Sequence, residues 1–116
     1  YALNEYQGKI IEGNKELNDE IEEIAIKKGI KINRGTILTS DAFYNEENQL
    51  KKAPEDLNCI GAEMEAFGLL HIANVLHKKA ICLLTVVKSF VTRKEANTIE
   101  REKRLIIMIE LALESI

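Results

Sequence analysis

Two glutamates flank a methionine in the middle of the chain, and their position makes them the first candidates for chemistry. Glu63, Met64 and Glu65 lie where a short apolar run ends and a helical pattern begins. At such a junction the carboxylates stand near backbone N–H groups and the positive end of the helix dipole, which favours their ionised forms. A carboxylate accepts both hydroxyls of a vicinal diol, and a thioether offers an apolar face to a sugar ring. The triplet therefore predicts a ribose site, unless the two acids only stabilise the first turn of the helix.

A pair of aromatic residues follows an earlier β-branched run. Phe43 and Tyr44 come shortly after the run that ends at Ser40, in a chain with 3 Phe, 3 Tyr and no Trp. A planar side chain at the end of a strand can stack on a base-like ligand, and it can equally fill the core. Both interpretations stay open for Phe43 on its residue type and position alone.

Other reaction classes have no support in the sequence. His71 and His77 lie on one predicted helix without the i, i+4 spacing that lets two imidazoles bind one metal ion. We therefore expect both to be structural or exposed, and we predict no metal site. No Ser-His-Asp order, zinc-ligand spacing or glycine-rich phosphate loop is present in the sequence.

The first part of the chain predicts one helix and one strand to position these residues. Residues 17–28 carry apolar side chains at helical spacing, with Asn18 or Asp19 to cap the first turn and Gly29 to end the helix. Residues 36–39 are rich in β-branched and apolar side chains, which is typical of a strand. This strand would deliver the aromatic pair to its end.

The second part predicts a strand, a helix and a strand in close succession. Residues 59–62 indicate a short strand, residues 63–79 a helix, and residues 80–87 (AICLLTVV) a central parallel strand that is covered on both faces. Such a βαβ unit is right-handed by default. Asn97 or Thr98 then caps a last helix that runs toward the end of the chain. The order of elements predicts an α/β fold.

Composition and charge limit the kind of protein. The chain has 116 residues, 46% of them apolar and 30% charged, which suits one compact domain over residues 1–116, with no firm element in residues 1–16. The 16 basic and 19 acidic residues give a net charge of −3 without a basic stripe, so we expect no nucleic-acid partner. The longest apolar run is far shorter than the roughly 20 residues that cross a bilayer. We therefore expect no membrane partner and a soluble, cytoplasmic protein.

Four motifs read together resemble a known family. They are TSDAFY at 39–44, GAEMEAFGLLHIA at 61–73, AICLLTVV at 80–87, and TIEREKR with IELALESI at 98–116. In order and spacing they look like the C-terminal half of the bacterial-type, DeoD-like purine nucleoside phosphorylases of the nucleoside phosphorylase-I family. The EMEA motif alone also resembles uridine phosphorylases and nucleosidases, whereas SDAFY ahead of it points to the hexameric purine branch.

The resemblance implies a fold, a reaction and a binding site. The family fold is a three-layer α/β/α domain around a mixed sheet, present here in part because its N-terminal strands are lacking. The implied reaction is phosphorolysis of a purine nucleoside to free base and ribose 1-phosphate, with phosphate as co-substrate and no cofactor. By resemblance, Phe43 stacks on the purine, Ala62 and Met64 line the base and sugar, and Glu65 binds the ribose hydroxyls with Glu63 beside it.

One position departs from the family pattern. Arg101 matches the arginine that pairs with a catalytic aspartate in the family, but Lys88 fills the position of that aspartate. The family's acid donates a proton toward N7 of the departing purine, and an ammonium group holds its proton more tightly than a carboxylic acid does. We expect either a repurposed Lys88 or a loss of catalysis. The next acid, Glu95, would reach this position only through a loop rearrangement.

The chain is also considerably shorter than members of the family. The part without a counterpart holds the phosphate loop and several strands, which leaves an unpaired sheet edge and an uncovered apolar face that favour association. We therefore expect a purine nucleoside as ligand and either a homo-oligomer or a complementing chain as partner. Two functions stay open: the base- and ribose-binding half of a purine nucleoside phosphorylase, or a degenerate, non-catalytic nucleoside-binding or oligomer-forming subunit.

Overall fold

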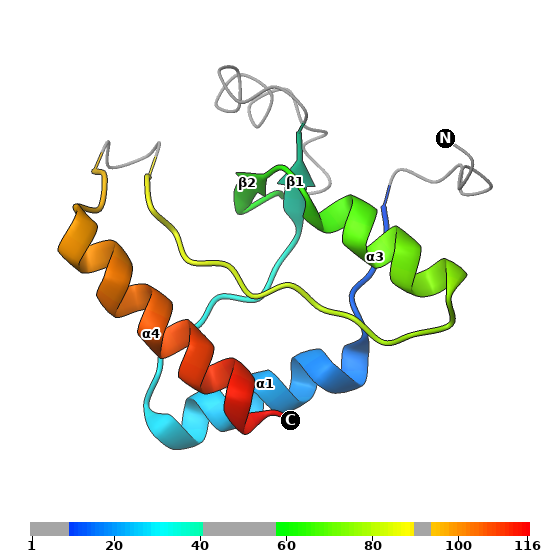
Figure 1. Ribbon diagram of the computed structural model, residues 1–116, viewed down its shortest axis with the longest axis horizontal. Coiled ribbons are helices and arrows are strands. Elements are labelled where there is room, and N and C mark those ends of the chain that lie inside the picture. Colours follow the sequence, from blue (N-terminus) through cyan, green and yellow to red (C-terminus); the bar gives the residue numbers. More distant parts are fainter. Residues whose placement is uncertain (1–9, 41–57, 90–93) are drawn as a thin grey trace. The chain divides into compact units, whose positions relative to one another are not determined.

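The computed structural model describes residues 10–40, 58–89 and 94–116. These residues form two compact units, each made of separate stretches of the chain. Figure 1 colours the chain along its sequence. The described residues of the first unit are 10–14, 33–40 and 58–81, and those of the second are 15–32, 82–89 and 94–116. Phe43, which the sequence predicts to stack on a base, lies outside the described residues.

The first unit is built on a small parallel sheet. β1 (Ile37–Thr39) pairs with β2 (Gly61–Glu63) in a register that sets Thr39 opposite Glu63 (Figure 1). The strand predicted over 59–62 is therefore present but ends at Glu63, since the carbonyl of Glu63 accepts a hydrogen bond of 2.8 Å from the residue after β1. Helices together with a parallel sheet confirm the predicted α/β class.

Helix α3 (Ala66–Val75) follows β2 after a short bend. It is shorter than the helix predicted over 63–79, because the ladder to β1 holds the first of those residues in the strand. At the other end His77 adopts a left-handed backbone with φ of 55°, and the N–H groups of His77 and Lys78 bond back to carbonyls of the last turn. Such a pairing ends a helix. The buried side chains of α3 are Ala66, Leu70 and His71.

The second unit contains two helices in contact with each other. α1 (Lys15–Lys28) packs against α4 (Thr98–Glu114) (Figure 1). Lys28 Nζ lies 2.5 Å from a carboxylate oxygen of Glu114. The buried apolar side chains of the two helices are Ile21, Ala25 and Leu111. Burial of this kind supplies most of the stability of a helix pair in water.

The two ends of α1 give opposite results for the predicted caps. Gly29 has a φ of 70°, and the N–H groups of Gly29 and Ile30 bond to carbonyls of the last turn at 3.1 and 2.9 Å, which confirms the predicted end. The predicted start is wrong, because α1 begins at Lys15 and holds Asn18 and Asp19 inside the helix. Asp19 instead forms an ion pair with Lys15, with 2.5 Å between Nζ and the carboxylate oxygen.

The central strand predicted over residues 80–87 is absent, and that prediction is wrong. Carbonyl groups of this segment make isolated hydrogen bonds instead of a strand ladder. The carbonyl of Ala80 accepts the N–H of Asn14 at 2.9 Å, and the carbonyl of Val86 accepts a hydrogen bond from Nη1 of Arg104 at 2.9 Å. A strand needs a neighbouring edge on which to pair its backbone groups, and no described strand pairs with this run. An apolar composition alone does not indicate whether such a neighbouring strand is present.

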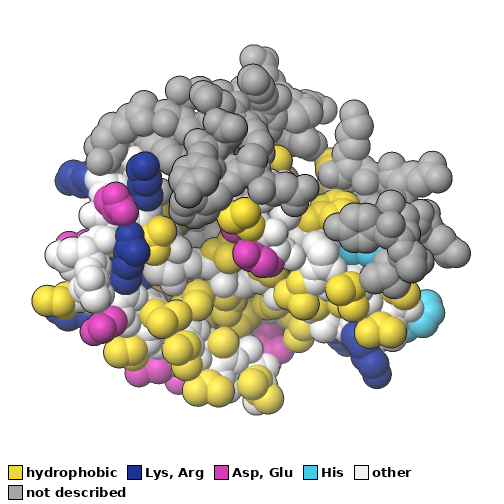
Figure 2. Space-filling model, turned by 45° about the horizontal axis from the view of Figure 1, so that its top comes forward, with side chains coloured by type: hydrophobic (Ala, Val, Ile, Leu, Met, Phe, Trp, Pro, Cys, Tyr) yellow, Lys and Arg dark blue, Asp and Glu magenta, His cyan; other side chains and the backbone are white. Residues whose placement is uncertain are grey.

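Many large apolar side chains of the described residues face solvent. Figure 2 shows such side chains in yellow at the surface. Those on α4 are Ile99, Leu105, Ile106, Ile107, Ile109 and Leu113. Helix α4 thus carries more apolar surface than its contact with α1 covers. Among the described residues, no helix is both long enough and apolar enough to cross a membrane.

Candidate functional site

Four of the predicted site residues come together at the junction between β2 and α3. Ala62 and Glu63 are the last two residues of β2, Met64 lies in the bend that follows, and Glu65 stands at the N-cap position of α3. The first three are half-buried, whereas Glu65 is exposed. The junction therefore offers one exposed carboxylate beside a half-buried thioether.

Both carboxylate oxygens of Glu63 are occupied within the junction. Oε2 accepts hydrogen bonds from the backbone N–H groups of Glu65 at 2.5 Å and Ala66 at 2.7 Å. Oε1 accepts a hydrogen bond from the hydroxyl of Thr39 on the neighbouring strand. The Glu63 carboxylate thus does the work of a helix cap from the end of the preceding strand.

The hydroxyl of Thr39 has a second partner at the start of α3. While it donates to Glu63, its oxygen accepts the backbone N–H of Phe67 at 3.1 Å. One donor proton and two lone pairs allow a hydroxyl to do both at once. Together, Thr39 and Glu63 satisfy the N–H groups of residues 65, 66 and 67, which no carbonyl inside the helix can reach.

The side chain of Glu65 is left out of this capping network. Glu65 occupies the N-cap position with φ of −128° and ψ of −25°, and its carboxylate makes no capping hydrogen bond. This carboxylate is exposed at the start of α3. It can accept two hydroxyl groups of a ligand without first giving up a bond to its own backbone.

A second group of predicted residues lies in the other unit, where the chain turns back before α4. Lys88 is paired with Glu95 in an antiparallel bridge, and the backbone bonds Ser89 N–H to Lys94 O at 2.9 Å and Ala96 N–H to Val87 O at 2.7 Å flank the bridge. Lys88 and Glu95 are both exposed. Backbone pairing therefore sets Glu95 opposite Lys88.

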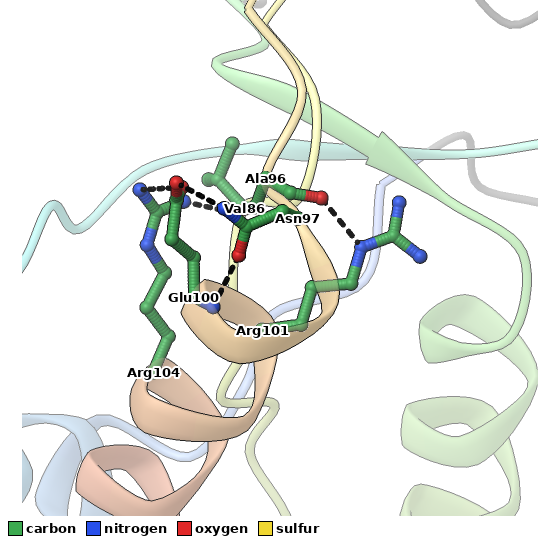
Figure 3. A network of polar contacts seen from close by, with 6 residues as sticks. All are labelled: Val86, Ala96, Asn97, Glu100, Arg101 and Arg104. Carbon is green, nitrogen blue, oxygen red and sulfur yellow. Dashed lines mark hydrogen bonds and ion pairs between the residues drawn. The ribbon is translucent and has the colours of Figure 1, made fainter.

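The guanidinium of Arg101 is held by this same turn. Its Nε donates to the carbonyl of Ala96 at 3.0 Å, and its Nη2 lies 2.9 Å from Oε1 of Glu95. Figure 3 shows the first of these bonds at the start of α4. Arg101 therefore pairs with the carboxylate of Glu95, at the bridge in which Lys88 takes part.

The first turn of α4 fixes the position of Arg101. Asn97 caps the helix, because its Oδ1 accepts the N–H of Glu100 at 2.8 Å while its Nδ2 donates to the Glu100 carboxylate at 3.0 Å (Figure 3). This confirms the cap predicted at Asn97. Arg104, one turn on, ties the helix to the extended segment through its bond to Val86 (Figure 3).

Two residues that matter here have weak signals in the sequence. Thr39 belongs to a predicted strand, but its bond to Glu63 spans 24 positions and depends on the register of two strands. The position of Glu95 opposite Lys88 depends in the same way on backbone pairing across a turn. Only a correct strand register would have revealed either residue.

No metal site is found in the described part of the chain, where no group of three or more His, Cys, Asp or Glu side chains could hold an ion. The chemistry of the junction is that of a carboxylate and backbone dipoles. In the turn before α4 the guanidinium of Arg101 is paired with the Glu95 carboxylate, and Lys88 stands opposite Glu95 in the backbone bridge.

Comparison with known proteins gives one family. A family model described as the phosphorylase superfamily matches residues 8–113. Among individual relatives, a protein of Clostridium novyi (strain NT) named purine nucleoside phosphorylase DeoD-type is 38% identical over 92 residues, which cover 79% of this chain and 40% of that protein. Proteins of the same name from Buchnera aphidicola subsp. Acyrthosiphon pisum (strain Tuc7) and Shewanella baltica (strain OS223) are 34% and 33% identical, over 83% and 88% of this chain.

The chain spans about two fifths of the length of these relatives, 40% to 43% of each. The family match nevertheless extends over nearly all of the chain, through the β2–α3 junction and the turn before α4 alike. The relatives agree with it, since each carries the name of a phosphorylase. The chain therefore belongs to the phosphorylase superfamily.

Proposed function

We propose that this chain forms the base- and ribose-binding part of a purine nucleoside phosphorylase. In the proposed reaction phosphate attacks the anomeric carbon of the nucleoside, the glycosidic bond breaks, and free purine and ribose 1-phosphate leave. Phosphate is a co-substrate, and no cofactor takes part. Support comes from the family and from relatives that are named purine nucleoside phosphorylases.

One observation carries the proposal: the carboxylate of Glu65 is exposed at the start of α3 and takes no part in capping. In the proposed complex it accepts the two ribose hydroxyls. Met64 and Ala62 would line the sugar and the base, and Phe43 would stack on the purine ring. Glu63 would lie beside the ribose as the residue that holds the junction.

By resemblance to the family, Lys88 and Arg101 would be the residues that assist the leaving purine. Lys88 stands at the position of the family's acid and opposite Glu95 in the backbone bridge, and Arg101 is paired with the Glu95 carboxylate. Protonation of a leaving group by a well-placed acid is worth about 10² to 10⁴ in rate. A lysine at that position makes such assistance weaker than that of a carboxylic acid.

The same lysine favours a second candidate function. In that function the chain is a non-catalytic nucleoside-binding or oligomer-forming subunit that works with a complete chain. The exposed apolar side chains of α4 suit an association with a copy of itself or with a complementing chain. A cytoplasmic location agrees with both functions, because nucleosides and phosphate are soluble metabolites.

Incubation with inosine or adenosine distinguishes the two functions. The purified chain is mixed with nucleoside in the presence and absence of phosphate, and free base is followed by chromatography. Phosphorolysis predicts base in proportion to protein and only with phosphate. Nucleoside binding without release of base would support the non-catalytic subunit. Absence of both binding and release would contradict the proposed function in either form.

A further inference from the structure

We propose that Thr39 and Glu63 act as positioning residues that keep the Glu65 carboxylate out of helix capping and available to a ribose diol. This inference rests on the proposed function for its ligand, and on the hydrogen bonds of the junction for its mechanism. Neither residue needs to touch the nucleoside in this role.

The strand register brings the two residues together. Thr39 and Glu63 are direct partners in the parallel pairing of β1 and β2. Side chains of paired residues emerge on the same face of a sheet, so the Thr39 hydroxyl meets the Glu63 carboxylate at the end of both strands. This contact joins a residue of β1 to the start of α3.

The Glu63 carboxylate then fixes the backbone of Glu65. Its Oε2 accepts the N–H groups of Glu65 and Ala66 at 2.5 and 2.7 Å. Hydrogen bonds to an ionised carboxylate are stronger than those between neutral groups. The Cα atom from which the Glu65 side chain projects is therefore held by two adjacent backbone bonds.

Thr39 occupies one of the donors that a capping Glu65 side chain would bind. An N-cap side chain normally accepts the N–H of the second or third helical residue. With Glu65 as N-cap, the second helical residue is Phe67, and its N–H is already bonded to Thr39 at 3.1 Å. One of the two donors that a capping Glu65 could bind is therefore taken, and the Glu65 carboxylate is exposed and makes no capping bond.

Loss of the Thr39 hydroxyl should reverse this arrangement. The N–H of Phe67 would lose its partner, and the nearby Glu65 carboxylate would accept it as an ordinary cap. A ligand would then have to break that cap before binding. The ribose contribution to nucleoside affinity would fall, while contacts to the purine would not change.

The first test measures that contribution by calorimetric titration with inosine and with hypoxanthine. Thr39→Val should weaken inosine binding by about five- to thirtyfold and leave hypoxanthine within about twofold, as expected for one lost hydrogen bond of this kind. Thr39→Ser keeps the hydroxyl and should retain the inosine affinity. Thr36→Val is the matched control, since Thr36 is exposed just before β1 and lies outside the network; it should behave as the unchanged chain.

The second test needs no ligand. Urea unfolding is followed for Thr39→Val, Glu65→Ala and the double variant. Glu65→Ala alone should leave the unfolding midpoint nearly unchanged, because Glu65 does not cap α3 in the unchanged chain. In the Thr39→Val background the same substitution should lower the midpoint further, because Glu65 has become the cap. Such non-additivity is the sign of direct coupling between two sites.

The two tests separate failure of the inference from failure of the proposed function. Additive unfolding effects, or an inosine affinity that Thr39→Val leaves unchanged, would overturn the positioning role and leave the proposed function standing. If the unchanged chain binds inosine no better than hypoxanthine, the proposed ribose site is wrong. The unfolding cycle then still decides whether Thr39 keeps Glu65 out of the cap.

Discussion

The starts of α3 and α4 solve the same problem in two different ways. At α4 the N-cap residue Asn97 bonds the N–H of Glu100 with its own side chain, and both partners lie within one turn. At α3 the N-cap residue Glu65 leaves its side chain unused, and the bonds come from Glu63 and from Thr39 on another strand. Capping is therefore local at α4, whereas at α3 the local bonds to Glu63 are joined by a long-range bond to Thr39.

The difference shows where the molecule keeps a polar side chain available. When the side chain of an N-cap residue bonds an N–H group of its own helix, that acceptor is not available to a ligand. At α3 the capping bonds come from Thr39 and Glu63, and the carboxylate of the N-cap residue Glu65 makes no capping bond. At α4 the side chain of Asn97 makes the cap, and Arg101 in the first turn is bonded to Ala96 and Glu95. The two helix starts therefore differ in whether the side chain of the N-cap residue takes part in the cap.

The largest effect is expected from a charge reversal near α4. Lys88→Asp would restore a carboxylic acid at the family's position, in a chimera where this chain replaces the matching 92-residue part of the Clostridium novyi relative. Phosphorolysis of inosine should rise at least about tenfold, because general acid assistance is worth about 10² to 10⁴. The rate is measured from release of hypoxanthine.

Lys31, which is exposed and far from Lys88 in the sequence, provides the control for this change. Lys31→Asp makes the same charge reversal outside the turn, and its chimera should retain the rate of the chimera with Lys88. An unchanged or lower rate in the Lys88→Asp chimera would show that position 88 is not a lost acid position.

Removal of the Glu63 cap should be the most damaging change to stability. Glu63→Ala leaves three donors, the Thr39 hydroxyl and the N–H groups of Glu65 and Ala66, without their acceptor. The free energy of unfolding should fall by about 1 to 3 kcal/mol. Urea unfolding monitored by circular dichroism measures it. Glu63→Gln keeps one carbonyl acceptor and should lose less; equal stability in all three proteins would refute a capping role for Glu63.

Removal of the local cap should cost less. Asn97→Ala deletes the acceptor of one N–H group and one contact to the Glu100 carboxylate. The expected loss is about 1 kcal/mol, the usual value for an N-cap substitution. Asn97→Ser keeps a capping oxygen and should retain most of the stability. A loss for Asn97→Ala that exceeds the loss for Glu63→Ala would reverse the comparison between the two helix starts.

The smallest effect concerns the pair that ties α1 to α4. The hydrogen bond from Lys28 to Glu114, helped by the negative charges of Glu114 and Glu110, raises the pKa of Lys28 above its usual 10.5. A raised folded pKa stabilises the fold below the unfolded pKa, and the contribution is lost as pH rises through the folded pKa. The difference in urea midpoint between the unchanged chain and Lys28→Gln should therefore shrink above pH 10.5.

Neighbouring Lys27 is the control for the pH experiment. It lies 3.6 Å from Glu23 on the same exposed helix surface, and exposed i, i+4 pairs contribute little. Lys27→Gln should show a smaller difference from the unchanged chain, with less dependence on pH. A Lys28→Gln difference that stays constant from pH 7 to strongly alkaline pH would contradict the raised pKa.

Local signals account for what the sequence predicted correctly. The apolar spacing of α1, the left-handed Gly29 and the cap at Asn97 each depend on residues within one or two turns. The strand-to-helix switch near Glu63 and Met64 was also recognised from a change of pattern. Local structure of this kind depends on steric effects and hydrogen bonds between residues that are close in sequence.

Features that depend on pairing partners were missed. The run over 80–87 has the composition of a buried strand, but composition does not provide an edge to pair with. The roles of Thr39 and Glu95 follow from which residue stands opposite them, and a shift of one position in register would remove both contacts. The division of labour between Glu63 and Glu65 could not be predicted either, because it depends on Thr39.

The central claim is that Glu65, released from capping, holds the ribose of a purine nucleoside. Calorimetric titration of the unchanged chain and of Glu65→Ala with inosine tests it most directly, with hypoxanthine as the ligand that lacks ribose and Glu102→Ala on exposed α4 as the matched control. Glu65→Ala should weaken inosine binding by about 1 to 3 kcal/mol and leave hypoxanthine binding unchanged. Equal inosine affinity in Glu65→Ala and the unchanged chain would contradict the account.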